Sequence, residues 1–288
     1  MDETLRIIDE YNQQLYNIYD REALPCLSDN GYSFKGQNVL AVSNPAIVNM
    51  SKIGLYDYLN EVTDKLKRPR FNDMHAVNEI IVATADLKYR LGTIFLYHPY
   101  IIKLEQSFYY HNGEKRFIYE QSRNDARFNR ELPIAFESLY KYWQRLSDYL
   151  LNFFPKGLLE CSGRSYFDTP LKYIKDKHPE LCESENFKWY LDFSTNVYPE
   201  FNTQRKFFVH TAGYDNQFFQ DYLESHNNEE SMISMDDKRT QFLNYFKDQL
   251  NLCMEGYFKI MNFLNEIEFS VTTKGQKNVF EYTLIKSK

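Results

Sequence analysis

The sequence predicts a soluble, mainly α-helical protein: a helical bundle that carries two peripheral β-hairpins. Apolar residues recur at spacings of three and four over several long segments, which is the period of an amphipathic helix. Two other segments carry aromatic and β-branched residues on both sides of a turn signal, as hairpins do. Aromatic residues make up 17% of the 288 residues and charged residues of both signs 26%, so a large core is expected and disorder is not.

The first third of the chain is expected to be helical. In the first twenty residues or so, one helix face carries the apolar residues Leu5, Ile8, Tyr11, Leu15 and Ile18. After a turn-rich stretch, Pro45 lies in the first turn of a second helix, which ends before Pro69. A third helix begins at Asn72 or Asp73 and extends to about Phe95.

A hairpin and a long helix follow. Asn112-Gly113, flanked by aromatic and β-branched residues, is the strongest short hairpin signal. The long helix is expected from about Glu131 to Phe154, with Pro133 in its first turn.

The last third is expected to contain four helices and the second hairpin. The helices are expected at about 167–177, 184–197, 200–211 and 234–263, with Asp237 near the capping-box position of the last one. The second hairpin turns at Lys274-Gly275. Because an isolated hairpin is marginal in water, the two hairpins should either pair into one small sheet or each lie on the bundle.

These elements divide the chain into four regions. They are an N-terminal helical region, a hairpin connector, a helical bundle and a C-terminal β-hairpin, at 1–96, 97–125, 126–265 and 266–288.

Composition restricts the cellular setting and the partners. The net charge of −6 gives no general attraction to phosphate or anionic lipid, so a nucleic-acid partner needs a local basic patch. The four cysteines lie far apart without a CxxC pair and are expected to be free thiols. Neither a signal peptide nor a membrane-spanning run is visible, so we expect a cytoplasmic protein with no membrane partner.

Many enzyme motifs are missing from the sequence. It has no GxxxxGK[ST] loop, GxGxxG, HExxH or GxSxG, and no Cys/His cluster with zinc spacing. We therefore predict no metal and no cofactor. Asp236 and Asp237 are interpreted as acids at a helix start rather than metal ligands, and Glu137 as a solvent-facing helix charge.

The residues best suited to catalysis lie in one segment, Arg205-Lys206-Phe207-Phe208-Val209-His210. An imidazole that titrates near neutrality can move a proton at a ribose 2′-OH or a leaving oxygen, while a guanidinium holds the scissile phosphate. The Phe-Phe-Val block would anchor the helix. Residues five apart on an ideal helix lie about 140° apart, so Arg205 and His210 converge only through a distorted helix end, the reach of the Arg side chain or a second subunit.

This segment resembles the RxxxxH signature of the HEPN superfamily (higher eukaryotes and prokaryotes nucleotide-binding domain). The helix AFESLYKYWQRLSDYLLNFF, with its central Trp, is similar to the first long helix of some prokaryotic branches, and the resemblance covers about Glu131 to Leu264. Many members are metal-independent ribonucleases whose active site forms at a homodimer interface. The resemblance implies that Arg205 binds phosphate, that His210 is the acid/base and that Lys206 binds substrate beside them.

Two features qualify the motif. Lys206 stands where the family usually has Asn, His or Asp. Arg70 and His75 have the same spacing, but they flank a predicted helix start, where capping explains the local polarity.

The expected function is a metal-independent endoribonuclease that cuts single-stranded RNA as a homodimer, acting as a toxin or defence effector under a regulatory protein partner. The alternative is a non-catalytic helical domain that binds a protein or nucleotide partner. In that case Arg205 forms a surface ion pair and His210 lies at a helix C-terminus. The aromatics around Lys115 and Arg116 suit stacking on single-stranded bases, although a hairpin face buried on the bundle explains them as well.

Overall fold

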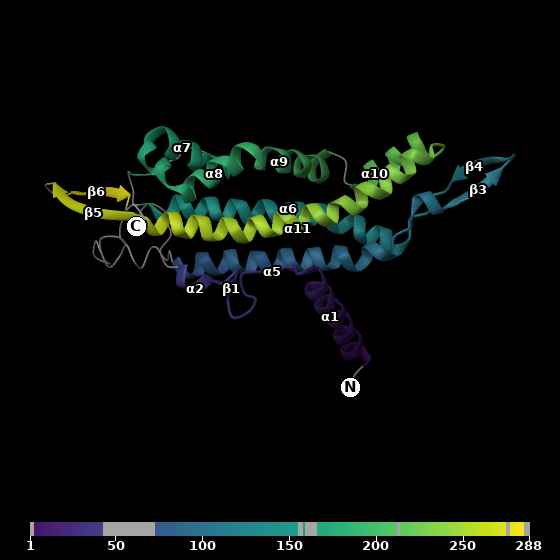
Figure 1. Cartoon of the computed structure of the whole chain (residues 1–288), viewed down its shortest axis with the longest axis horizontal. Helices are drawn as coiled ribbons and strands as arrows, with labels where there is room; N and C mark the ends of the chain where they lie inside the picture. Colours follow the sequence, from purple (N-terminus) through teal and green to yellow (C-terminus); the bar gives the residue numbers. More distant parts are fainter. Residues whose placement is uncertain are drawn as a thin grey trace. The chain divides into compact units, whose positions relative to one another are not determined.

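The computed structural model describes residues 3–42, 73–154, 158, 166–211, 214–274 and 277–284. Helices dominate it, so the prediction of a mainly α protein is confirmed (Figure 1). The longer helices are α1 (Glu3–Glu22), α5 (Asp73–Tyr97), α6 (Arg123–Phe153), α7 (Thr169–Lys177), α8 (Glu185–Asn196), α9 (Tyr198–Lys206), α10 (Tyr214–Ser225) and α11 (Glu229–Asn265). No helix in the described ranges is long and apolar enough to span a bilayer.

The remaining elements are short turns and strands. They are α2 (Val39–Val42), the 3-10 turns η1 (His98–Tyr100), η2 (Leu104–Gln106) and η3 (Pro179–Glu183), and the π-helical turn η4 (Phe207–Thr211). The strands are β1 (Ser33–Phe34), β2 (Gln37–Asn38), β3 (Phe108–His111), β4 (Glu114–Phe117), β5 (Ile267–Lys274) and β6 (Lys277–Leu284). The helix predicted between Pro45 and Pro69 lies outside the described residues.

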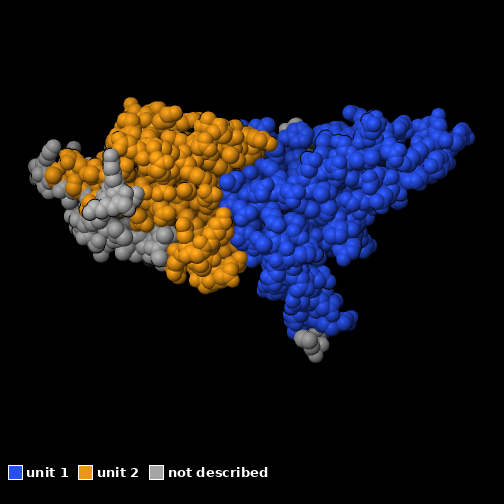
Figure 2. All heavy atoms as spheres, viewed as in Figure 1, with its two compact units in different colours: residues 1–25, 85–140, 202–252 blue, residues 26–84, 141–201, 253–288 orange. Residues whose placement is uncertain are grey.

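The chain divides into two compact units (Figure 2). Unit 1 comprises residues 1–25, 85–140 and 202–252, and unit 2 comprises residues 26–84, 141–201 and 253–288. Unit boundaries fall inside α5, α6, α9 and α11, so each of these helices supplies residues to both units. The four consecutive regions proposed from the sequence remain a prediction.

The core of unit 1 is a cluster of aromatic rings. Phe136 of α6 lies with its ring centroid 4.8 Å from Phe246 of α11 and 5.1 Å from Phe208 of η4. Phe208 also contacts Phe242, at 5.6 Å. Ring contacts of this kind add stabilisation beyond the burial of their apolar area.

The core of unit 2 is centred on Trp143 of α6, which is fully buried. Its ring lies 4.3 Å from that of Phe193 on α8. Gly256 of α11 makes this packing possible, because a Cβ there would lie 2.8 Å from two atoms of the indole ring. The hydroxyl of Tyr190 donates to the Gly256 carbonyl at 2.6 Å, so α8 also contacts the same point of α11.

Two long helices begin earlier than predicted. At the start of α6, the Ser122 hydroxyl accepts from the Asp125 N–H and the Asp125 carboxylate accepts from the Ser122 N–H, both at 3.1 Å. This reciprocal pair is a capping box built with Asp. Pro133 therefore lies inside α6 and not in its first turn.

Helix α11 begins at Glu229, where Asn228 accepts from the Ser231 N–H at 3.2 Å. Asp236 and Asp237 consequently lie within the helix, and their interpretation as acids at a helix start was wrong.

Both predicted hairpins are present, and each is a separate two-stranded sheet among the described strands. Of the two arrangements expected, pairing of the hairpins into one sheet does not occur among the described strands. In the first hairpin, Asn112 and Gly113 have φ angles of 51° and 82°, which is the two-residue turn that the sequence predicted. In the second, Lys274 pairs with Lys277, so the turn falls between them. The small hairpin β1–β2 and helix α10 were not predicted.

Candidate functional site

Arg205 lies one residue before the end of α9 and is held by α6. Its Nε and Nη2 atoms both donate to Glu137 Oε2, at 3.1 and 2.9 Å. Its guanidinium carbon lies 4.1 Å from the centroid of the Tyr140 ring, a cation–π distance. The Arg205 side chain is 12% exposed and that of Glu137 30%. Glu137 is therefore the partner of the candidate phosphate-binding residue and not simply a solvent-facing charge.

His210 lies in the π-helical turn that continues α9, whereas the sequence predicted an unbroken α-helix to about residue 211. A π-helix bonds residue i to residue i+5 and turns through a smaller angle per residue than an α-helix, so the turn after Arg205 lowers the angle between positions 205 and 210 below the about 140° of an ideal α-helix. The π turn therefore brings the backbone positions of Arg205 and His210 closer to one face. The His210 side chain is outside the described part of the structure, and Lys206 is exposed.

The apolar block of the motif fixes this turn in part. Phe208 packs on Phe136, Phe242 and Tyr214, the last at 5.4 Å, and so ties η4 to the core of unit 1. Phe207 is 38% exposed. Phe208 is thus an anchor as predicted, whereas Phe207 is not.

The contacts of Arg205 leave part of the guanidinium for another ligand. Among the described side chains, its hydrogen bonds use Nε and Nη2, and both reach the same oxygen of Glu137. The two N–H groups of Nη1 can therefore point to a phosphate oxygen without breaking the ion pair. A guanidinium held in this way is positioned in advance for an anion.

A second polar centre, which the sequence reasoning missed, is buried in unit 1. The Arg239 and Asp125 side chains are both 0% exposed and form an ion pair. Arg239 Nη1 also donates to the Ile102 carbonyl at 2.8 Å, and Asp125 accepts from the Ile102 N–H at 3.2 Å. The one sequence signal was the Ser122/Asp125 capping box. These contacts connect α6, α11 and the segment after α5, which is a structural role.

Two ionisable side chains close to Arg239 titrate abnormally. Burial, followed by the charges of Lys103 and Arg239, lowers the pKa of His98 from 6.5 to about 4. Burial raises the pKa of Tyr214 above its usual value, and the charge of Arg239 opposes that rise. His98 is therefore neutral at pH 7 and does not act there as a general acid.

The other histidines take structural or surface positions where they are described. Both ring nitrogens of His178 are hydrogen-bonded, to Tyr282 and to the Leu158 carbonyl, at 2.6 Å each. His226 bonds the Leu223 carbonyl at 2.7 Å. Arg70 of the second RxxxxH match, and the side chain of His75, lie outside the described residues.

No group of His, Cys, Asp or Glu that could hold a metal ion occurs among the described residues. Asp236, once considered as a ligand, lies 3.6 Å from Arg239 Nη1 and accepts from the Glu105 N–H at 3.3 Å. Its neighbours are therefore a cation and a backbone donor.

No family model, curated protein or solved structure matches the chain. The resemblance to the HEPN superfamily accordingly rests on the sequence motif alone.

Proposed function

We propose that the chain is a metal-independent endoribonuclease of HEPN type that cuts single-stranded RNA. The observation that supports this proposal best is the π turn at Phe207–Thr211, because it contains His210 and lowers the angle between the backbone positions of Arg205 and His210 below the about 140° of an ideal α-helix. Arg205 holds the scissile phosphate, Lys206 binds the neighbouring RNA backbone and His210 transfers protons. Action as a homodimer in the cytoplasm, a toxin or defence role and control by a protein partner belong to the same proposal and remain predictions from the sequence.

The reaction needs one base, one acid and a cation. The imidazole of His210 removes the proton of a ribose 2′-OH, and the 2′-oxygen attacks the adjacent phosphorus. The bond from phosphorus to the 5′-oxygen breaks, and the leaving oxygen takes a proton from the imidazole of a second copy. The products are a 2′,3′-cyclic phosphate and a 5′-OH. Arg205 stabilises the negative charge that develops on the phosphate oxygens.

Glu137 and Tyr140 act on Arg205 as positioning residues. The carboxylate holds Nε and Nη2, the ring supports one face of the guanidinium, and Nη1 is left for the phosphate. A lysine at position 205 keeps the charge but cannot reproduce this fork.

The decisive experiment measures cleavage of a fluorescent single-stranded RNA in EDTA. We expect His210→Ala to lower the rate by about 10²–10⁴-fold, the usual contribution of general acid–base catalysis. Arg205→Lys should lower it by about 10²-fold, because the charge remains but its placement is lost. His226→Ala is the matched control and should cut at the normal rate. Equal cleavage by His210→Ala and the unmodified protein would remove the motif from the mechanism.

The alternative, a non-catalytic binding domain, is favoured by a different observation. Arg205 is mostly buried and paired with Glu137, as expected of a residue that serves the fold. In that case the purified protein cuts no RNA at any concentration, and Arg205→Lys changes only stability.

A further inference from the structure

The β3–β4 hairpin exposes aromatic side chains that the sequence alone leaves ambiguous. All four residues of β3 are exposed, with Phe108 at 42%, Tyr109 at 48% and Tyr110 at 69%. A face buried on other elements therefore explains Phe117, which is buried, but not the aromatics of β3. Phe108 and Tyr110 share one face of the hairpin, with ring centroids 5.8 Å apart, and Tyr109 lies on the other face. Exposed aromatic surface on a folded protein marks an interaction site.

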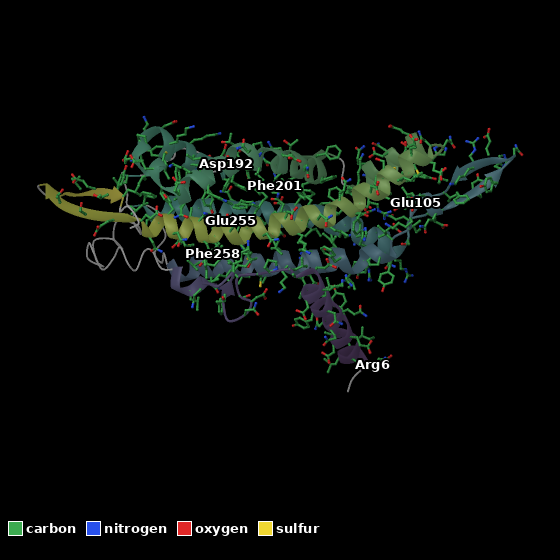
Figure 3. The ribbon with its side chains drawn as sticks, viewed as in Figure 1. Arg6, Glu105, Asp192, Phe201, Glu255 and Phe258 are labelled. Carbon is green, nitrogen blue, oxygen red and sulfur yellow. The ribbon has the colours of Figure 1, made fainter. Side chains whose placement is uncertain are left out.

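The hairpin is fixed at its base to other elements of unit 1. The Tyr222 hydroxyl of α10 donates to the Phe117 carbonyl at 3.1 Å and accepts from the Tyr119 N–H at 3.0 Å. Phe117 itself is buried. Lys115 and Arg116 reach Glu229 and Asn227 at the start of α11 and in the loop before it, and the hairpin runs beside α10 as a two-stranded ribbon (Figures 1 and 3). The exposed rings are thus presented on a supported arm.

The hairpin already binds one cation of its own, the ammonium group of Lys115. Lys115 Nζ lies 4.2 Å from the centroid of the Phe108 ring and 4.8 Å from that of Phe117. The same ammonium lies 2.5 Å from Glu229 Oε1. A positive charge is therefore bound by aromatic faces and a carboxylate together, an arrangement stronger than either contact alone.

The charges around the hairpin select a positively charged partner. The hairpin's own cations are already paired, Lys115 with Glu229 and Arg116 with Glu114. The segment 214–238, which anchors the hairpin, contains one lysine and seven acids, a net charge of −6. Asp236 is buried beside Arg239 and Glu229 pairs with Lys115, so the acids left on the surface are Asp215, Asp221, Glu224, Glu230 and Asp237. Such a surface repels phosphate and attracts cations.

An open hollow of about 620 Å³ beside the hairpin has matching chemistry. Phe108 and Ile118 supply its apolar wall, Gln106 and Gln121 supply amide oxygens, and Glu120 is its only charged lining residue. A guanidinium can stack on the ring, bond the amides and pair with the carboxylate.

We propose that the β3–β4 hairpin and the hollow beside it form a docking surface for an arginine- and lysine-rich segment of a partner protein. Tyr109 and Tyr110 supply ring faces for its cations on the two sides of the hairpin, and Glu120 supplies a carboxylate. Single-stranded RNA is disfavoured here, because the local cations are engaged and the surrounding charge is negative. This surface does not depend on the ribonuclease proposal and is tested without RNA cleavage.

The test measures binding of a fluorescein-labelled octa-arginine peptide to the full chain by anisotropy. We expect saturable binding that the double variant Tyr109→Ala/Tyr110→Ala weakens by about tenfold, since two cation–π contacts are lost. Tyr16→Ala is the matched control, because Tyr16 is a similarly exposed tyrosine of unit 1, on α1, and should leave binding unchanged. Glu120→Gln should also weaken binding and reduce its dependence on salt.

Two outcomes would overturn the proposal. If the double tyrosine variant binds octa-arginine as tightly as the unmodified chain, general charge attraction explains the binding and the hairpin has no part in it. If labelled octa-uridine binds more tightly than octa-arginine and is released by the same double variant, the surface binds nucleic acid. Far-UV circular dichroism of each variant verifies that the helices are intact.

Discussion

At the scale of single residues, Arg239 illustrates what a buried charge requires of its surroundings. Its guanidinium is completely enclosed, and it is balanced by Asp125, by the Ile102 carbonyl and by the ring of Phe218, 4.9 Å away. Removing one member of a buried pair leaves the other charge without compensation, which costs more than the pair itself contributes.

Asp125→Ala should therefore destabilise unit 1 strongly. We expect its free energy of unfolding to fall by about 3–5 kcal/mol, because a buried guanidinium loses its counter-charge and α6 loses its capping box. Urea denaturation followed by far-UV circular dichroism measures the change.

The double variant Asp125→Ala/Arg239→Met is the informative control. Replacing both charges with apolar groups should recover much of the lost stability. Glu185→Ala, which breaks an exposed pair with Lys188, should cost less than about 1 kcal/mol. Equal losses in Asp125→Ala and Glu185→Ala would contradict the account given for Arg239.

The sequence identified the candidate residues of the site but not their partners. Arg205 and His210 are recognisable from a local spacing. Glu137 meets Arg205 only because α6 and α9 pack together, and no local pattern predicts that contact. The π turn was equally hidden, because an RxxxxH segment looks the same in an α-helix.

At the scale of elements, periodicity and turn chemistry predicted most helices and both main hairpins. The misplaced ends have identifiable causes. Pro133 resembled a first-turn proline although it lies inside α6, and the capping Asn228 is hidden in a polar loop before α11. Helix α10 is short and interrupted by polar residues, so its period was not recognised. Whether the side chains of β3 are buried or exposed depends on the elements around the strand, so their exposure could not be predicted from the residues of β3 alone.

The terminal hairpin depends on a chain of hydrogen bonds centred on Tyr282. Its hydroxyl donates to Glu180 and contacts His178 Nδ1, while His178 Nε2 must donate to the Leu158 carbonyl. Tyr282 thereby links the hairpin to η3 through Glu180 and to His178, which in turn bonds the Leu158 carbonyl.

Tyr282→Phe should loosen the attachment of β5 and β6. It deletes the bonds to Glu180 and His178 while keeping the ring, and we expect amide exchange of the hairpin to accelerate by about tenfold or more. Hydrogen–deuterium exchange with mass spectrometry measures this effect. Tyr173→Phe is the control, because that ring lies 5.9 Å from His178. Unchanged exchange in Tyr282→Phe would show that the hairpin is held by other contacts.

At the scale of the whole molecule, stability should depend on pH through His98. The folded protein holds the pKa of His98 at about 4, whereas the unfolded chain binds the proton near pH 6.5. Between these values the unfolded state binds more protons. The free energy of unfolding should therefore be fully retained above about pH 6.5 and decline as the pH falls toward about 4.

Comparing urea midpoints at about pH 7 and about pH 5 tests this expectation. The decline should be smaller in His98→Asn, because asparagine has no group that takes up a proton in this pH range. His226→Asn is the control, because His226 lies in the loop after α10. The free energy of unfolding of this variant should decline with falling pH as it does in the unmodified protein. A decline of the same size in His98→Asn would assign the acid sensitivity to other groups.

The position of Trp143 has a practical consequence for following the two units separately. The chain has two tryptophans, and both Trp143 and Trp189 belong to unit 2. Intrinsic indole emission therefore reports on unit 2 only. The circular dichroism of the peptide bonds, measured at about 222 nm, reports on the helices of both units. Recording the two signals during the same titration reveals whether the units melt together, without any label or engineered probe.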